Sequence, residues 1–399
     1  MSVNIPRLRK WLAASAIVLI VIVAGTYFYG RWRVSRAVRD IPRQLGIDIK
    51  QSTEGFVLSK SEGGRTIFVV RASKAVQYAP GGRAELRDVL ILVYGRQADR
   101  FDQIYGERFE YDPETGNVSA MGEVHIDLEG NAEGPVAPDQ SQPLELKNPI
   151  HLQTSGLVFN QNTGLAQTRE RIEFRTQQAS GSARGAIYNS GDATLTLQSE
   201  VQFHAAGDDP ADVRANRATI TRNPYRAVLE TVQVERAAGG LRSDRLTVLF
   251  RENNSVEHLI ALGNVQATTK GGPGVSVRAP RADAWVTEQS LIRSAVLSGG
   301  VAFQSQSASD GNATELDGTA GRVALNFREG NMHSMTASDR VRIAQSGAQG
   351  SRRRIELIAP GMIFDVAERQ VRHAVTTGSS EMVLTEFGGG RSVATAARL

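Results

Sequence analysis

The stretch that decides the fold begins Val275-Ser-Val-Arg-Ala-Pro-Arg-Ala-Asp-Ala-Trp-Val286, passes through Thr287-Glu-Gln-Ser290, and ends Leu291-Ile-Arg-Ser-Ala-Val-Leu-Ser-Gly-Gly-Val-Ala-Phe303. Apolar residues alternate with polar or small ones in short runs, and turn-forming residues interrupt these runs. Alternation with a period of two is typical of strands, whereas an amphipathic helix repeats every ~3.6 residues. The stretch therefore predicts a β-meander rather than a helix.

The same unit recurs along the chain. Its closing strand has the form Gly-x-Val-x-apolar at Gly122, Gly263 and Gly299, and the alternation continues without the glycine at Ile172/Phe174, Val201/Phe203, Val341/Ile343 and Met382/Leu384. Its opening strand carries two small residues three positions apart, at Ala72/Ala75, Ala215/Ala218, Ala279/Ala282 and Gly318/Gly321. Recurrence of this kind is typical of stacked supersecondary units. We expect one repeated β unit to build most of the chain.

The charge is distributed unevenly. Eight of the 46 basic side chains and one of the 42 acidic ones lie in residues 1–43, which leaves 38 basic and 41 acidic side chains in residues 44–399, a net charge of −3. The positive excess therefore flanks an apolar N-terminal segment, and nucleic-acid binding has little support. The chain has no cysteine, which excludes disulfides and thiol chemistry.

That N-terminal segment, Trp11 to Tyr29, is an almost unbroken apolar run. As a helix it would be about 28 Å long, enough to cross the hydrocarbon core of a membrane, and the aromatic residues at its ends suit the two interfaces. A cleaved signal peptide, with Val23 and Gly25 as the small residues of its cleavage site, is the alternative. Basic residues lie on both sides, so the charges alone leave the orientation open.

The remaining organisation follows from composition. We expect a tail over residues 1–10, a transmembrane helix over 11–29, a juxtamembrane connector over 30–48, two β regions over 49–205 and 206–386, and a flexible tail over 387–399. A Gly-, Pro- and Asp-rich insert interrupts the first β region at residues 129–149. The predicted fold class is mainly β, an antiparallel sheet of repeated strands behind one N-terminal helix.

Catalytic patterns are missing from the sequence. The six histidines are scattered, with no His-Glu-x-x-His and no pair at metal-ligand spacing. There is no Gly-x-Ser-x-Gly nucleophile elbow and no phosphate-binding Gly-x-x-x-x-Gly-Lys. We therefore expect a protein that is not an enzyme, with no catalytic residues, metal site or cofactor.

One face of the predicted strands is regularly apolar. It is either the sealed core of a sandwich or, where the sheet folds over without closing, the wall of a groove that could shield acyl chains from water. The residues expected to line such a lipid-binding groove are Phe68, Val70, Val124, Ile126, Val201, Phe203, Val301 and Phe303. Alternation alone does not separate these two interpretations.

Several segments resemble the lipopolysaccharide-transport family LptC and its LptA/OstA-like relatives. The resemblance is carried by residues 55–72 (Gly-Phe-Val-Leu-Ser-Lys-Ser-Glu-Gly-Gly-Arg-Thr-Ile-Phe-Val-Val-Arg-Ala), by residues 109–124, by residues 157–166, and by the Ala-x-x-Ala…Gly-x-Val cadence over 213–343. It implies an open antiparallel β-jellyroll in the periplasm, a single-pass inner-membrane anchor and a cytoplasmic N terminus. The chain is about twice as long as that family usually is.

The function implied by this resemblance is glycolipid export. Lipopolysaccharide, or a related glycolipid, would be received from an inner-membrane ABC transporter and passed along an apolar groove toward an LptA-like periplasmic bridge protein. The alternative is a membrane-tethered structural or adhesion scaffold without a lipid ligand. The last regular strand of the pattern contains Met382, Val383 and Leu384 and no basic residue or proline, so we expect it to be an open edge that docks with a partner by strand addition.

Overall fold

The computed structural model describes residues 48–79, 82–94, 101–128, 149–207, 210–222, 224–253, 255–270, 274–309, 312–346, 353–367, 370–386 and 390–399. These residues form strands and no helix, which confirms the mainly β class. Within the described ranges no helix is long and apolar enough to span a bilayer. The predicted transmembrane helix over 11–29, the segments beside it up to residue 47 and nearly all of the insert 129–149 lie outside them.

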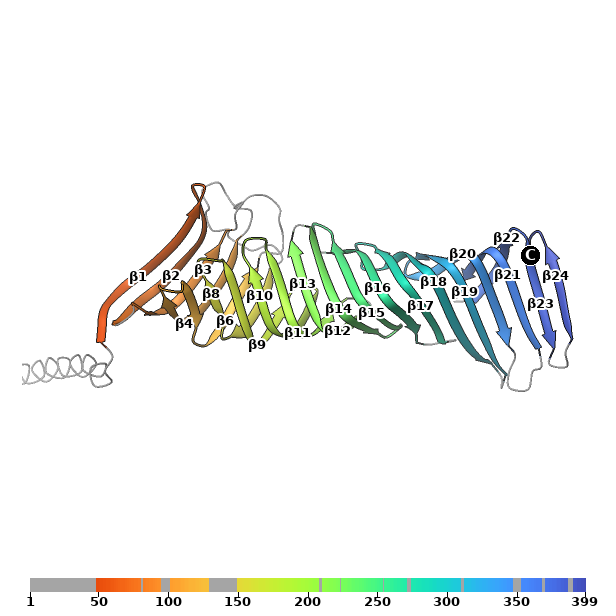
Figure 1. The fold of residues 1–399 in the computed structure, drawn as a ribbon, viewed down its shortest axis with the longest axis horizontal. Coiled ribbons are helices and arrows are strands. Elements are labelled where there is room, and N and C mark those ends of the chain that lie inside the picture. Colours follow the sequence, from red (N-terminus) through yellow and green to blue (C-terminus); the bar gives the residue numbers. More distant parts are fainter. Residues whose placement is uncertain are drawn as a thin grey trace, which may run out of the picture.

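The strands, in chain order, are β1 (Asp48–Glu62), β2 (Arg65–Ala79), β3 (Ala84–Val93), β4 (Asp102–Asp112), β5 (Asn117–Ala120), β6 (Glu123–Leu128), β7 (Ile150–Ser155), β8 (Val158–Asn160), β9 (Leu165–Arg175), β10 (Ala179–Asn189), β11 (Thr194–Ala205), β12 (Ala211–Ala215), β13 (Arg217–Arg222), β14 (Tyr225–Arg236), β15 (Gly239–Phe250), β16 (Val256–Thr269), β17 (Gly274–Val286), β18 (Ile292–Ser309), β19 (Asn312–Arg328), β20 (Asn331–Ser346), β21 (Arg353–Ala367), β22 (Gln370–Thr377), β23 (Ser380–Glu386) and β24 (Arg391–Ala396). They form one antiparallel sheet that runs from β1 to β24 as an elongated stack (Figure 1). Most successive strands are antiparallel neighbours, as in a meander.

Each long strand is interrupted near its middle, and the interruptions line up across the sheet. The pairings from β16 to β21 shift register at successive points, such as Leu262/Val265, Arg278/Arg281 and Ser298/Val301. Residues with left-handed φ angles lie at these shifts, among them Asn264 at 46° and Gly299 at 91°. Bulges of this kind bend a strand sharply. The sheet therefore folds over along one line.

The bend divides the sheet into two half-sheets. In other parts of the sheet the interruption at the bend is complete, and one long strand is replaced by two short strands, one in each half-sheet. We call half-sheet A the half that contains β6, β7, β12 and β23, and half-sheet B the half that contains β5, β8, β13 and β22. The halves contact each other inside the fold, where the ring of Phe68 from half-sheet A meets Phe159 of half-sheet B edge-on, with centroids 5.2 Å apart. We call the side that each half turns toward the other the inner face.

The paired small residues noted in the sequence flank the bend. Ala72 and Ala75 lie on either side of it in β2, and Ala215 and Ala218 lie on either side of it between β12 and β13; all four are buried. A bulge breaks the alternation, so two inner residues come three positions apart instead of two. The two halves converge at the bend and leave room only for small side chains. The Ala-x-x-Ala pattern is therefore the sequence signature of the bend.

The interior contains two main hydrophobic clusters. One extends from Ile67 to Val265 and the other from Ala279 to Phe364, so the change between them falls between β16 and β17. The sheet itself is continuous across the expected region boundary at 205/206, because β11 pairs with β12 there. The two expected β regions are thus parts of one sheet.

The C-terminal residues correct two expectations. β24 pairs with β23 along its length, and the terminal Leu399 exchanges hydrogen bonds with Thr376. The prediction of a flexible tail over 387–399 is wrong for the described residues 390–399. The prediction that the strand containing Val383 is the last one is also wrong. β24 is mostly exposed and is held by backbone bonds, so its sequence lacks the alternation by which the other strands were found.

Candidate functional site

An unbroken apolar row crosses the inner face of half-sheet A. Each member is the direct cross-strand partner of the next, from β1 to β24, and no member is polar. We call this row stripe A; it consists of Leu58, Val70, Ile91, Ile104, Ile126, Leu152, Phe174, Gly181, Phe203, Val213, Val234, Leu241, Ala267, Val277, Phe303, Gly318, Ile343, Leu357, Met382 and Ala394.

Half-sheet B carries a matching row. Its members are again consecutive cross-strand partners, with two tyrosines as the only hydroxyl-bearing residues. We call this row stripe B; it consists of Ala84, Tyr111, Val118, Phe159, Ala166, Tyr188, Leu195, Ile220, Ala227, Val248, Leu259, Ala284, Ala295, Leu325, Met335, Phe364 and Ala374. The space between the two stripes is the candidate site, here called the trough.

The eight residues predicted to line a groove all lie on the inner face. Val70, Ile126, Phe203 and Phe303 belong to stripe A, and the others occupy neighbouring rows on the same face, namely Phe68, Val124, Val201 and Val301. Six of them are buried, whereas Phe203 and Phe303 are half-buried. Their contact with lipid stays a prediction.

The trough is filled near its N-terminal end. A cavity between the two stripes, lined by Ile104, Leu152, Leu195 and neighbouring side chains, has a volume of only about 10 Å³. A space of that size holds at most one water molecule. The Tyr188 hydroxyl also donates a hydrogen bond to the carboxylate of Asp102, whose residue is only 1% exposed, and so joins the two half-sheets. In this part the inner face is a packed core.

Toward the C-terminal end the stripes become more accessible. Val70 and Ile91 are fully buried, Val277, Ile343 and Leu357 are half-buried, and Met382 is 39% exposed. In the second hydrophobic cluster the buried residues lie mainly close to the bend, and the stripe residues pack only partly against them. The inner face therefore offers apolar side chains to a ligand mainly beyond β16.

Two glycines in stripe A make room for aromatic rings, a feature that alternation could not predict. A Cβ atom on Gly181 would overlap the side chains of Phe174 and Phe203, and one on Gly318 would overlap the ring of Phe303. Phe174 and Phe203 meet above Gly181 with ring centroids 6.3 Å apart. A ring laid over a cross-strand glycine keeps the stripe continuous where a side chain is missing.

The expected partner edge is not an edge. Met382, Val383 and Leu384 lie in β23, which pairs with β21 on one side and with β24 on the other. Their backbone groups are therefore engaged within the sheet, and strand addition at these residues is excluded in this arrangement. In the described part of the chain, the open side at this end of the sheet belongs to β24.

The polar contacts on the described strands form small groups rather than a metal or catalytic cluster. Within the described ranges no three residues of the metal-ligating types come together. His151 pairs with Asp127, His204 with Asp212 and His258 with Asp283, at 2.6, 2.9 and 3.3 Å. Hydrogen bonds from the Arg281 guanidinium lower the pKa of Asp283 below its usual value. Three of the scattered histidines thus each lie beside a carboxylate from a neighbouring strand position.

Comparison with known protein families gives a match to the N-terminal part of the chain, where side chains fill the trough. Residues 17–206 match the family described as LptC: Lipopolysaccharide-assembly, LptC-related. This part of the chain is therefore similar to that family. The matched segment includes the strands from β1 to β11, and both stripes continue from it into the later strands without interruption. A search among curated proteins finds no match.

Proposed function

We propose that the chain is a non-enzymatic conduit for the acyl chains of lipopolysaccharide or a related glycolipid. Stripe A carries this proposal, because beyond β16 it offers partly exposed apolar side chains to a ligand, and no polar residue interrupts it along the sheet. Each methylene group moved from water into such a path gains about 0.8 kcal/mol. The match of residues 17–206 to a lipopolysaccharide-assembly family supports the same ligand class.

Transport along this path needs no catalytic side chain. Along the partly open strands beyond β16, an apolar surface would bind each acyl segment with similar free energy, so an acyl chain could slide without crossing a large barrier. Direction would come from outside, from an inner-membrane ABC transporter that loads glycolipid at the β1 end. The apolar run Trp11–Tyr29 would anchor the chain in the inner membrane, with the sheet in the periplasm.

The far end would deliver glycolipid to an LptA-like bridge protein. Met382 and Ala394 end stripe A, and both are exposed. A second sheet docked on the open side of β24 would continue the hydrogen bonding and the stripe together. In this proposal the junction lies at β24, one strand further along than the strand expected from the sequence.

The packed N-terminal core favours a second candidate function, a tethered scaffold with a sealed interior and no lipid. The two functions differ in whether lipid contacts the inner face. A photo-crosslinking amino acid at Phe303 tests this, with Ala302 as the matched control, because Ala302 is the neighbouring residue on the opposite face. The full-length protein would be isolated from cells that export lipopolysaccharide. Capture of glycolipid at 303 and not at 302 supports the conduit; absence of capture at 303 in a folded protein supports the scaffold.

A further inference from the structure

A second row of side chains lies beside stripe A on the inner face of half-sheet A. It is formed by the residues two positions beyond the members of stripe A, on the side away from the bend, which therefore point to the same face. We call it the rim row; from β2 to β7 it consists of Phe68, Val93, Asp102, Leu128 and Ile150. The first four are buried and Ile150 is half-buried.

The rim row closes the trough over these strands. Phe68 meets Phe159 of stripe B edge-on, with ring centroids 5.2 Å apart, and the hydroxyl of Tyr188 donates a hydrogen bond to Asp102. Leu128 and Tyr188 line the same cavity of about 10 Å³. Large side chains thus bridge the two half-sheets, which as stacked sheets lie ~10 Å apart.

Beyond β7 the rim row becomes small. Thr176 in β9 is followed by Ala179, Ala205 and Ala211, which are consecutive cross-strand partners in β10, β11 and β12. An alanine side chain is too short to cross a space of ~10 Å. The closure by the rim row is therefore confined to the strands from β2 to β7 and the part of stripe B that faces them.

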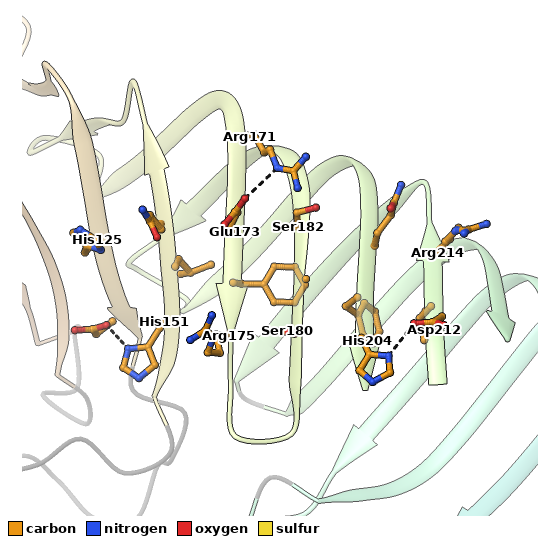
Figure 2. A pocket seen from close by; sticks show the side chains of 18 of the residues that line it. His125, His151, Arg171, Glu173, Arg175, Ser180, Ser182, His204, Asp212 and Arg214 are labelled. Carbon is orange, nitrogen blue, oxygen red and sulfur yellow. Dashed lines mark hydrogen bonds and ion pairs between the residues drawn. The ribbon is translucent and has the colours of Figure 1, made fainter. Parts of the chain in front are cut away.

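Asp102 is the exception within this closure. It is 1% exposed, and every other member of the rim row from β2 to β7 is apolar. Polar side chains of the neighbouring strands gather instead on the outer face, among them His151, Glu173 and Arg171 (Figure 2). Burial of a carboxylate requires hydrogen bonds in place of water. The Tyr188 hydroxyl supplies one such bond from the opposite half-sheet.

The polar pair and its apolar neighbours respond differently to an acyl chain. A chain that enters between the half-sheets can replace the contacts of Phe68 or Leu128 with similar apolar ones. It offers no hydrogen-bonding group to Asp102 or Tyr188. Entry therefore breaks their bond, and Asp102, on the rim side of stripe A, then has to be hydrated from the mouth of the trough.

We propose that the Tyr188–Asp102 pair is a latch that determines when the N-terminal part of the trough admits acyl chains. While the bond is made, the rim row rests on stripe B and the trough is closed from β2 to β7. When it breaks, the half-sheets separate there and stripe A becomes accessible from Val70 to Leu152. The latch rests on the proposed function, because glycolipid loaded at the β1 end has to pass these strands.

Labelling of a single cysteine measures this opening without any lipid. The chain has no cysteine of its own, so Leu152→Cys places one thiol among the side chains that line the filled cavity. In the full-length protein, Tyr188→Phe should raise the rate at which a thiol reagent labels this residue about tenfold, the effect of losing a hydrogen bond of roughly 1.4 kcal/mol. Labelling of Val341→Cys, buried in β20, should keep its rate, because the opening is local.

Tyr111→Phe is the matched control, since Tyr111 is the other tyrosine of stripe B. Its hydroxyl accepts a hydrogen bond from Gln161, 3.2 Å away, which directly follows β8 of the same half-sheet. That bond does not join the two halves, so Tyr111→Phe should leave the labelling of Leu152→Cys unchanged. Asp102→Asn keeps an acceptor for Tyr188 and should be labelled at a rate closer to the parent than to Tyr188→Phe. Unchanged labelling in Tyr188→Phe, or an equal increase in Tyr111→Phe or at Val341→Cys, would overturn the latch.

A leucine-sized photo-crosslinking residue in place of Leu152 shows whether lipid uses the same opening. In cells that export lipopolysaccharide, the ratio of glycolipid capture at Leu152 to capture at Phe303 should rise several-fold in Tyr188→Phe. Capture at Phe303 with none at Leu152 in either protein would overturn the latch and leave the conduit beyond β16 standing. Absence of capture at both positions, together with faster cysteine labelling in Tyr188→Phe, would count against the conduit, because the half-sheets would then open without admitting lipid.

Discussion

The ring of Phe303 in β18 lies over Gly318, its direct cross-strand partner in β19, and fills the space that a side chain on that glycine would occupy. The large side chain of Phe303 thus requires a residue without a side chain at position 318 on the neighbouring strand. The same arrangement holds for Phe174 and Phe203 around Gly181.

Gly318→Ala should therefore destabilise the protein by about 1 to 3 kcal/mol, because the new methyl group overlaps the Phe303 ring and forces it out of its position. When Phe303 is already replaced by alanine, the Gly318→Ala change should destabilise the protein much less. The double-mutant cycle should therefore show a coupling of at least about 0.5 kcal/mol. Denaturant titration measures all four proteins. Gly274→Ala is the control, since a Cβ there meets no atom within 4 Å. Additive effects at 303 and 318 would contradict the contact.

Glutamates at Val301 and Phe303 should have different effects although both residues face inward. Val301 is 2% exposed, so Val301→Glu buries a carboxyl group at a cost of several kcal/mol. Burial raises the pKa of that carboxyl, and the variant should lose further stability as the pH rises. Phe303→Glu can reach water from its half-buried position and should remain folded while losing glycolipid capture. Circular dichroism at pH 5 and pH 8 measures the first effect, and co-purified lipid measures the second. Equal loss of fold in both variants would indicate a sealed core at this position.

Tyr188→Phe removes the hydroxyl that joins stripe B to Asp102 and should lower the free energy of unfolding by about 1.5 to 3 kcal/mol, as expected for a hydrogen bond to a charged group. Tyr225→Phe is the matched control. Tyr225 packs its ring against Phe250, with centroids 4.6 Å apart, and no hydrogen bond of its hydroxyl is seen in the described part of the chain. Unfolding in urea compares the two variants. Similar losses in both would show that the Tyr188–Asp102 bond does not hold the half-sheets together.

The contacts of Asp283 predict that the stability of the protein depends on pH in the acidic range. Hydrogen bonds from Arg281 lower the pKa of Asp283 in the folded protein below its usual 3.8. A depressed carboxyl pKa gives stability that is present above the unfolded value and is lost as the pH falls through the folded one. The free energy of unfolding of the wild type should therefore decrease below about pH 4. That of Asp283→Asn should be lower at neutral pH and should decrease less steeply as the pH falls. Urea titrations between pH 7 and pH 3 measure both slopes; parallel curves would contradict the assignment.

Docking at β24 can be tested with adjacent prolines. Neighbouring amide groups of a strand point to opposite sides, so one of Val393 and Ala394 directs its N–H toward β23 and the other toward the open side. One of the variants Val393→Pro and Ala394→Pro should keep β24 in place and lose the bridge partner. Co-purification of the LptA-like partner measures binding, and amide exchange at β23 reports whether β24 is still paired. Retention of the partner by both folded variants would place the junction elsewhere.

The sequence alone determined the strands and their inward faces. Alternation such as Val275-x-Val277 and Val301-x-Phe303 has a period that only strands satisfy, and pairs such as Ala72/Ala75 and Ala215/Ala218 mark several of the bends. It also indicated the lipopolysaccharide-transport relationship, which the match over residues 17–206 bears out. These properties are local, because a strand and its apolar face are set by residues a few positions apart.

Only the tertiary structure decided which of these faces are sealed and where the sheet ends. Val70 and Phe303 have the same pattern in sequence, but one is closed in by the opposite half-sheet and the other is half-open, because burial depends on residues far away in the chain. β24 has no apolar alternation to reveal it, since backbone hydrogen bonds to β23 hold it rather than burial. His151 and Asp127 likewise come together only because β6 and β7 pair in the sheet.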